Sequence, residues 1–289
     1  MHIPFSIINF TPDSFSDGGE FFCESAVYDR ISFLKRLGVL YFDIGAQSTA
    51  PSNPDVGFNE ELYRIKSVLT PSILNLLDNC YISVDTFRPG IIFYVLDLIK
   101  NYNLKGILWN DVSGVLCSEV EKYLSYSKNC RYIFCHNNSP SRESTCDHMD
   151  FVEDINGPLL VNSVVNYFKV NLDTIASKHY SQIVFDTCFG FSKTASQNYT
   201  LINNHHVLEY SIPEIKNWVI GISRKSFLRK LVLEDALLGY DETVFKQSMS
   251  LLETYGVYNY FRGNCNYYIR SHMPENFILF NKFDMILST

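Results

Sequence analysis

Strand-like and helix-like segments alternate along this sequence, and the alternation limits the possible folds more than any other feature. Eight short runs rich in β-branched and aromatic residues, bounded by turn residues, predict strands. Segments with the apolar spacing of helices lie between them. The predicted strands are 5–8, 40–44, 81–84, 106–109, 132–135, 182–185, 218–222 and 267–269, and the predicted helices include 26–37, 60–69, 91–101, 158–177 and 242–255.

Strands that alternate with helices pair in parallel through right-handed crossovers. Eight such units in 289 residues predict an α/β chain that folds as a single (β/α)8 TIM barrel, with residues 1–289 as one domain. A doubly wound open sheet is the alternative, but it usually has fewer strands at this length. The Gly-rich G-x-G-x-x-G turn of many such sheets and the P-loop motif are absent from the sequence.

Charge and cysteine content exclude several classes of function. A net charge of −7 argues against a surface for nucleic acid, which usually carries a basic excess. The eight cysteines form no C-x-x-C pair, so we expect buried, reduced thiols rather than a disulfide framework. The sequence has no signal-peptide pattern and no apolar run of about 18 residues. We therefore expect a cytoplasmic protein that binds neither nucleic acid nor membrane.

Polar side chains stand at or just past the carboxyl end of every predicted strand, which is where a barrel of this kind gathers its functional groups. A single Asp after a strand is more often a helix N-cap than a catalytic group, but capping does not readily explain polar residues at all the ends. These residues are Asn9, Asp43, Asp85-Thr86, Asn110-Asp111, His136-Asn137, Asp186, 223–226 and 270–272.

One set of these side chains suits a planar ring. Asp85, Asn110 and Asp186 offer two carboxylates and one amide. A carboxylate accepts two parallel N–H bonds, so this set can read the donor and acceptor edge of a heterocycle. The set predicts an amide- and amine-rich ring at the floor of a pocket.

A second set suits an anion. Lys225, Arg270 and His272 offer cationic or switchable donors, which fit phosphate or pyrophosphate. Asn9 offers an oxygen for Mg²⁺ that is held by the same anion. The set predicts an anion at the lip of the pocket.

The stretch NFTPDSFSDGG at residues 9–19 has more hydrogen-bonding groups than a plain turn needs. We expect it to fold over a charged ligand, with Ser14, Ser16 and Asp17 as contacts and Gly18-Gly19 as a hinge.

Seven stretches together resemble the dihydropteroate synthases, in that family's order and spacing from residue 5 to about 275. TPDSFSDGG and SRKSF are the most specific pair among them. The stretches are NFTPDSFSDGG (9–19), DIGAQSTAP (43–51), SVDTFRP (83–89), NDVSG (110–114), DTCFGFSKT (186–194), GISRKSF (221–227) and IRSH (269–272).

The resemblance implies an enzyme of folate biosynthesis. It would join 6-hydroxymethyl-7,8-dihydropterin pyrophosphate to p-aminobenzoate, giving 7,8-dihydropteroate and pyrophosphate. The implied mechanism is dissociative: pyrophosphate leaves first, and the amine traps a pterin-methyl cation. A carboxylate near the ring would stabilise that cation, while cationic side chains and Mg²⁺ would stabilise the leaving group. Mg²⁺ as cofactor and a homodimer are implied by the resemblance alone.

The resemblance also assigns roles to individual residues. The implied catalytic residues are Asp85, Lys225 and Asp17, and the implied pterin contacts are Asp85, Asn110, Asp186, Phe191 and Lys225. The implied pyrophosphate contacts are Asn9, Thr49, Arg270 and His272, with Asn9 as the metal ligand. The p-aminobenzoate side would comprise Phe15, Ser48, Thr49, Pro51 and Ser226.

Three loops depart from the family pattern. Ala50 stands where G-E-S-T-R-P-G has Arg, which removes a charge-assisted contact of about 1.5–3 kcal/mol. If that contact forms mainly in the transition state, the rate falls by about tenfold to a hundredfold. Thr187, Cys188 and Ser192 replace the Pro and two Gly of D-P-G-F-G-F-G-K. The fifth strand's M-H-x-x-G-x-P reads CHNNSP here, with Ser139 in place of Gly.

Two alternative functions stand beside the synthase. A catalytically weakened or non-catalytic pterin-binding barrel is suggested by Ala50 and the altered 186–193 loop. A methyltetrahydrofolate-dependent methyltransferase ranks lower, because it should lack the pyrophosphate set that is present here. The roles of two further residues stay open. His136 could pack in the interior or support the site. Lys193 could be solvated or could support the phosphate end.

Overall fold

The computed structural model describes residues 1–9, 24–47, 55–228 and 242–279. Within these residues, parallel strands form a closed barrel in sequence order, and β8 pairs with β1 to complete it. The predicted (β/α)8 barrel is confirmed. Its strands are β1 (His2–Asn9), β2 (Tyr41–Gly45), β3 (Tyr81–Asp85), β4 (Gly106–Asp111), β5 (Cys130–Cys135), β6 (Ile183–Asp186), β7 (Asn217–Ile220) and β8 (Asn266–Ser271).

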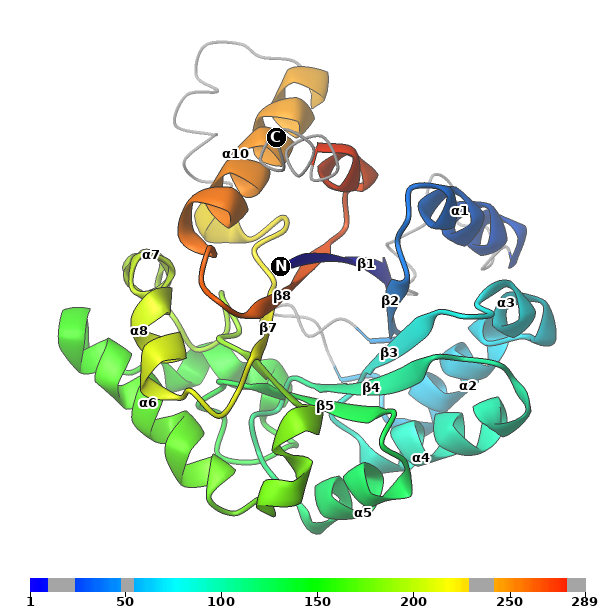
Figure 1. Cartoon of the computed structure of the whole chain (residues 1–289), viewed down its shortest axis with the longest axis horizontal. Coiled ribbons are helices and arrows are strands. Elements are labelled where there is room, and N and C mark those ends of the chain that lie inside the picture. The colour runs from blue at the N-terminus through cyan, green and yellow to red at the C-terminus, as the bar shows by residue number, and fades with distance from the viewer. Residues whose placement is uncertain (10–23, 48–54, 229–241, 280–289) are drawn as a thin grey trace.

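Helices cover the outside of the barrel (Figure 1). Those that correspond to predicted segments are α1 (Glu24–Arg36), α2 (Phe58–Val68), α4 (Pro89–Leu98) with the 3-10 helix η2 (Ile99–Asn101), α6 (Gly157–Leu172) and α10 (Glu242–Tyr260). The prediction of 158–177 was too long at its carboxyl end. Further helices are α3 (Pro71–Leu76), α5 (Ser118–Tyr126), α7 (Ala195–Asn203) and α8 (His205–Ser211), with the 3-10 helices η3 (Thr145–Phe151) and η4 (Ser177–Gln182).

Local sequence signals fix where several helices begin. The Thr70 side chain caps α3 by accepting the backbone N–H of Ile73, and Pro71 occupies the first turn, where its missing N–H costs nothing. Helix α7 begins with a capping box between Thr194 and Gln197. The first cap separates α3 from α2, and the second ends the loop after β6.

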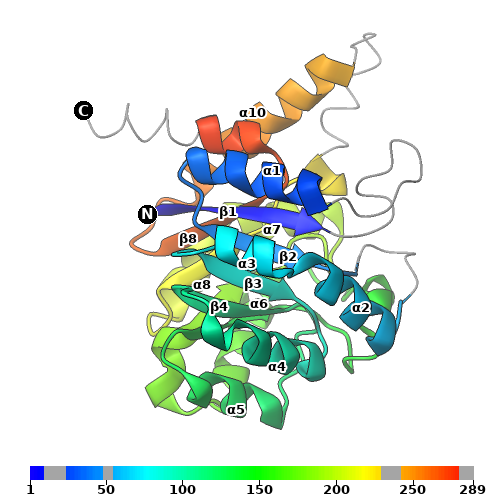
Figure 2. The ribbon, with the colours of Figure 1, turned by 90° about the vertical axis from the view of Figure 1, so that its right-hand side faces the viewer.

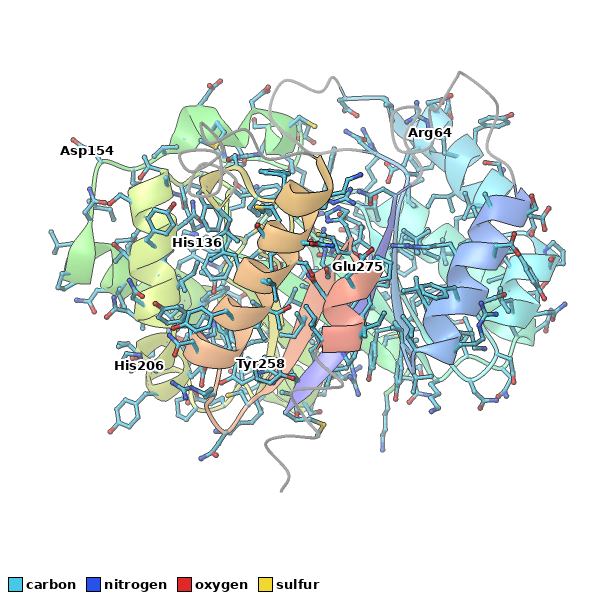
Figure 3. All side chains as sticks on the ribbon, turned by 90° about the horizontal axis from the view of Figure 1, so that it is seen from above. Arg64, His136, Asp154, His206, Tyr258 and Glu275 are labelled. Carbon is cyan, nitrogen blue, oxygen red and sulfur yellow. The ribbon has the colours of Figure 1, made fainter. Side chains whose placement is uncertain are left out.

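Two apolar layers hold the barrel together. Side chains alternate along each strand, so one set faces the helices and the other faces the barrel axis. Trp109, Phe168 and Trp218 belong to the outer layer, whereas Phe5 and Ile133 belong to the inner one. Figure 3 shows how densely side chains fill the space between the helices and the barrel. The inner layer closes the barrel below the carboxyl ends of the strands.

All strand neighbours are parallel, so every strand presents its carboxyl end at the same edge of the barrel. Figure 2 shows the barrel from the side, with α1, α2 and α3 along one flank. The part of the chain that the structure describes contains no helix with the length and apolar character needed to cross a bilayer.

Candidate active site

A cavity of about 610 Å³ opens at the carboxyl edge of the barrel, between the ends of β1 and β3 and the loops after β6, β7 and β8. The predicted residues that line it are Asn9, Asp85, Phe191, Lys225, Ser226, Arg270 and His272. A smaller cavity of about 50 Å³ shares several of these residues and is also lined by Asp186. The structure therefore brings most of the described candidates to one place.

Arg270 connects several carboxylates at this edge. Its Nε lies 2.9 Å from Asp43 Oδ2, and its Nη2 lies 3.0 Å from Asp85 Oδ2. Burial opposes the charge on Arg270, but the carboxylates of Asp43, Asp85 and Asp186 raise its pKa above the ordinary value. The guanidinium is therefore a fixed positive charge between β8, the middle of β2 and the end of β3.

Asp43 is a site residue that the sequence analysis named only as a strand end. It is buried, and its Oδ2 accepts a hydrogen bond of 3.2 Å from Asn110 Nδ2. Because it also pairs with Arg270, it orients one predicted pterin reader and one predicted anion binder. Its place in the DIGAQSTAP stretch was the available signal, but the partners were not readable from the sequence.

The two predicted ring-reading carboxylates lie in a poorly solvated setting. Burial raises the pKa of Asp85 to about 7, and Arg270 opposes this shift. Burial also raises the pKa of Asp186, again against Arg270. Asp186 Oδ1 accepts the backbone N–H of Cys188 at 2.6 Å, which fixes the carboxylate at the start of the loop after β6. Burial therefore favours the protonated form of both groups, compared with an exposed aspartate.

Lys225 lies against the loop after β6. Its Nζ is 4.7 Å from the centre of the Phe191 ring, a cation–π contact. Burial lowers the pKa of Lys225, while Cys188 and Asp186 act to raise it. Gly190 has φ +87°, and a Cβ there would lie 3.3 Å from Lys225 Cδ. The glycine thus gives the lysine its place in the cavity wall.

Lys193 holds this loop together from inside. Its Nζ donates to the carbonyl oxygens of His136 at 3.0 Å, Phe191 at 2.8 Å and Cys188 at 3.4 Å. The side chain is buried, and burial lowers its pKa to about 8. A solvated position for Lys193 is therefore wrong; it fixes the backbone beneath Phe191.

The backbone of the loop after β6 is also strained at two positions where the family pattern has glycine. Cys188 has φ +55° and Ser192 has φ +49°, in the left-handed region that favours glycine. Ser192 offsets part of this cost, because its Oγ donates to Asn137 Oδ1 at 2.9 Å and lies 2.8 Å from the carbonyl oxygen of His148. The loop thus keeps a glycine-like backbone with other side chains.

His272 is partly buried beside the cationic groups. Burial lowers its pKa to about 3, and Arg224 and Arg270 add to the shift. Its Nδ1 lies 3.4 Å from Ser223 Oγ. At neutral pH this imidazole is therefore neutral, and it offers one donor rather than a positive charge.

Two strand-end residues point away from the cavity, as the alternation of side chains requires. Asp111 follows the inward-facing Asn110 and instead binds Tyr132 and Arg142, at 2.7 Å and 2.5 Å. His136 packs on Tyr167, with ring centres 4.6 Å apart, and burial lowers its pKa well below the ordinary value. Of its two open roles, His136 has the packing role. Figure 3 places it in the packed interior.

Some predicted residues lie outside the described residues. They are Phe15, Asp17, Ser48, Thr49 and Pro51, together with Ser14, Ser16, Gly18-Gly19 and Ala50 of the same two loops.

Comparison with known proteins decides the family. The family described as pterin binding enzyme matches residues 5–252. The chain belongs to the pterin binding enzyme family. Its curated relatives include the dihydropteroate synthase of Synechocystis sp., which is 30% identical over 236 residues, covering 78% of this chain and 73% of the relative. The type-3 dihydropteroate synthase of Escherichia coli is 26% identical over 266 residues, covering 88% and 93%.

Solved structures of this pterin-binding family share the fold. One is the dihydropteroate synthase of Anaplasma phagocytophilum with bound 6-hydroxymethylpterin-monophosphate, which aligns over 99% of both chains with TM-score 0.69 and 22% identity. Another is the Xanthomonas albilineans enzyme with 4-aminobenzoic acid, which covers 99% of this chain and 93% of that one with TM-score 0.70 and 20% identity. The resemblance to dihydropteroate synthases that the motifs predicted is confirmed.

Proposed function

We propose that this chain is a dihydropteroate synthase of folate biosynthesis. It condenses 6-hydroxymethyl-7,8-dihydropterin pyrophosphate with p-aminobenzoate, giving 7,8-dihydropteroate and pyrophosphate. The relatives confirm the predicted function and the predicted class of enzyme, a transferase. One observation carries the proposal at the level of residues: carboxylates, an amide and cations meet at the carboxyl edge of one barrel.

The inner part of the site suits the pterin. Asp85 and Asp186 accept N–H groups of the ring when they are ionised, and Asn110 contributes an amide whose orientation Asp43 fixes. Phe191 and Lys225 supply an aromatic face and a donor at the wall of the cavity. Hydrogen bonds from a bound pterin would compensate these carboxylates for the hydration that burial removes.

The outer part suits the pyrophosphate. Arg270 is a fixed cation, and His272 is a donor that gains its proton as phosphate charge approaches. Asn9 Oδ1 lies at the end of β1 on the wall of the same cavity. A lone amide oxygen fits Mg²⁺ that keeps water and phosphate oxygens as its other ligands. When bound, Mg²⁺ would neutralise charge on the leaving pyrophosphate.

These charges favour the dissociative route. As the C–O bond to pyrophosphate breaks, positive charge develops on the pterin methylene and negative charge on the leaving group. Asp85 stabilises the first, and Arg270, Lys225 and His272 stabilise the second. The amine of p-aminobenzoate then traps the cation and loses a proton. Ser226 is the described residue of the p-aminobenzoate side, and it lines the same cavity.

The finer statements about the whole protein are also proposals. We infer that residues 1–289 form one pterin-binding domain and that the chain works as a homodimer in the cytoplasm. All seven cysteines that lie in the described residues are free thiols, which supports a reducing compartment. Sedimentation velocity at micromolar concentration tests the dimer.

A pyrophosphate-release assay tests the function. It contains Mg²⁺, dihydropterin pyrophosphate and p-aminobenzoate, and it compares the wild type with Lys225→Ala and Lys122→Ala. Lys122 is an exposed lysine and serves as the matched control. We expect turnover that requires p-aminobenzoate, a loss of about 100-fold or more in kcat/KM for Lys225→Ala and no change for Lys122→Ala. Pterin binding without turnover would instead favour the non-catalytic barrel.

A further inference from the structure

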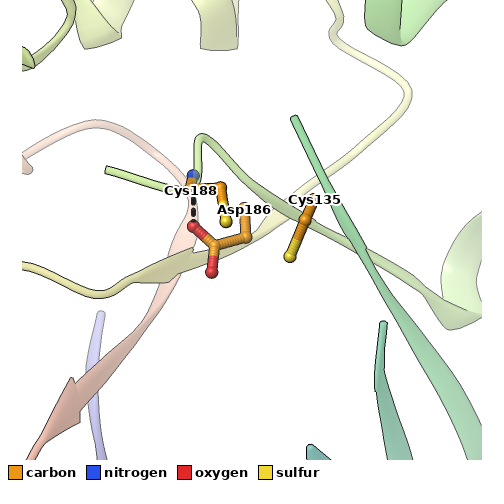
Figure 4. Close-up of side chains that lie close together, drawn as sticks. All are labelled: Cys135, Asp186 and Cys188. Carbon is orange, nitrogen blue, oxygen red and sulfur yellow. Dashed lines mark hydrogen bonds between the residues drawn. The ribbon is translucent and has the colours of Figure 1, made fainter. Parts of the chain in front are cut away.

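Three buried side chains form a compact group at the floor of the site. The Sγ atoms of Cys135 and Cys188 and a carboxylate oxygen of Asp186 all lie within 4.8 Å of one another. Figure 4 shows these three groups close together. Among the residues that the structure describes, this is the one cluster of three potential metal ligands. The synthase chemistry assigns no task to either thiol.

The backbone fixes this arrangement. Cys135 ends β5 directly opposite Asp186 in β6, so their positions follow from strand pairing. The backbone N–H of Cys188 donates to Asp186 Oδ1 at 2.6 Å, and the left-handed conformation at Cys188, with φ +55°, holds the turn. The three ligands therefore come from two adjacent strand ends and one tight turn, and they need little reorganisation to meet a common ion.

We propose that Cys135, Cys188 and Asp186 bind a thiophilic divalent cation such as Zn²⁺. Two sulfur ligands at about 2.3 Å from one ion lie at most about 4.6 Å apart, so the present spacing needs only a small contraction. Three protein ligands leave the fourth tetrahedral position for water or another ligand, as in catalytic zinc sites. The smaller cavity, lined by Asp186 and Cys188, provides access to that position.

The charges around the cluster are compatible with the ion. On binding, each thiol releases its proton to solvent and coordinates as thiolate. Two thiolates, one carboxylate and a divalent ion leave one net negative charge. Lys193 and Lys225 both interact electrostatically with Cys188, and Arg270 does so with Asp186. These cations lie close enough to balance the negative charge of the loaded cluster.

Occupation of this site would exclude the pterin, because both need the Asp186 carboxylate. This consequence rests on the proposed function, whereas metal binding itself does not. We therefore expect Zn²⁺ to inhibit turnover by competition with dihydropterin pyrophosphate.

Titration with Co²⁺ tests the site. It uses the full chain in the presence of a phosphine reductant, which keeps the thiols reduced. Thiolate coordination gives a sulfur-to-cobalt charge-transfer absorption, and Zn²⁺ added afterwards should abolish it. We expect one equivalent of Co²⁺ per chain to produce the band, with release of about two protons. Absence of the band, or a band that Zn²⁺ leaves unchanged, would overturn the proposal and leave the cysteines as apolar packing.

Three variants locate the ion. Cys188→Gly suits the left-handed backbone, and Cys135→Ala removes the sulfur without enlarging a fully buried side chain, so neither should prevent folding. Each variant should weaken Zn²⁺ binding by more than 10–100-fold, which is the typical cost of losing a residue that only hydrogen-bonds to a metal ligand. Cys117→Ser, at a thiol outside the cluster, is the matched control and should leave the band intact. Equal bands in all variants would place the ion elsewhere and reject the site.

Competition then separates this inference from the proposed function. Dihydropterin pyrophosphate should displace Co²⁺ from the wild type, and Zn²⁺ should inhibit the wild type at least tenfold more strongly than Cys188→Gly. If the chain shows no synthase turnover, the charge-transfer band still decides the metal site. Metal and pterin bound together without mutual effect would contradict a shared Asp186.

Discussion

Arg270 at the end of β8 and Asp43 in β2 form an ion pair of 2.9 Å, although β1 lies between their two strands. The same Asp43 accepts a hydrogen bond from Asn110 in β4. One buried carboxylate therefore sets the positions of Arg270, which lines both cavities, and of Asn110, which is fully buried on another strand. Its role is to position them, since it lines neither of the two cavities described above.

Replacing Asp43 should test this positioning role. Asp43→Asn leaves Arg270 with Asp85 as its remaining ion-pair partner and places an amide next to a buried cation. We expect the free energy of unfolding to fall by about 3 kcal/mol, because removal of one partner from a buried pair is costly. We also expect KM for the pterin substrate to rise more than kcat falls. Urea unfolding and steady-state kinetics measure both effects.

Asp97→Asn is the control for that variant, because Asp97 is an exposed carboxylate that pairs with Lys100. It should leave the unfolding midpoint and the kinetic constants unchanged. Equal behaviour of the two variants would show that Asp43 has no positioning role.

The raised pKa of Asp85 makes stability depend on pH. Its pKa rises from 3.8 to about 7 through burial, and Asp43 and Glu61 add to the shift, while Arg270 and Lys225 oppose it. Between these pH values the folded chain keeps a proton that the unfolded chain has released. The contribution of Asp85 to stability is therefore present at low pH and is lost as pH rises through about 7.

Urea unfolding of the wild type and Asp85→Asn at a series of pH values measures this contribution. The stability of the wild type should fall relative to that of Asp85→Asn as pH rises toward 7. Parallel stability curves for the two proteins would show that the pKa of Asp85 is the same in the folded and unfolded chains.

Lys193 should stabilise the loop after β6. Lys193→Met keeps the length of the side chain but removes three charge-assisted hydrogen bonds to backbone carbonyls. We expect a loss of about 3 kcal/mol in the free energy of unfolding, since one such bond contributes about 1.5–3 kcal/mol and the three are not additive. Chemical denaturation measures it, and Lys178→Met, at an exposed lysine, is the control. A loss no larger than that of the control would contradict the assigned role.

The barrel and most of the described site were predictable because both follow from periodic patterns. Strands such as 81–84 and 106–109 have clear boundaries, and parallel pairing brings Asp85, Asn110 and Arg270 to one edge. The partners of Asp43 were not predictable in this way. They depend on which side chains meet across the barrel, and sequence spacing carries no such information.

Short elements and buried donors were missed for other reasons. Helix α7 begins at a capping box of Thr194 and Gln197, which is a local signal present in the sequence. The role of Lys193 depends on the directions of three carbonyl groups in a loop with unusual backbone angles, which only the folded structure reveals. The replacement of glycine at positions 188 and 192 marked this loop as unusual, but it did not indicate which side chains hold the loop in place.

Gly190 should control the position of Lys225, and a second glycine allows that effect to be isolated. Gly190 and Gly38 have nearly the same backbone angle, with φ +87° and +85°. A Cβ at Gly38 would meet no atom within 4 Å, whereas one at Gly190 would lie 3.3 Å from Lys225 Cδ. Both Ala variants therefore have the same left-handed strain, about 1–2 kcal/mol. Only Gly190→Ala also displaces the lysine.

We expect the two variants to lose similar stability in urea unfolding but to differ in catalysis. Gly190→Ala should bind the pterin substrate about tenfold more weakly, because a displaced Lys225 loses most of one charge-assisted hydrogen bond. Gly38→Ala should keep the affinity of the wild type. Since backbone strain is matched, a difference in affinity assigns the effect to Lys225. Equal affinities would mean that Lys225 adapts to the added methyl group and that the glycine serves only the backbone.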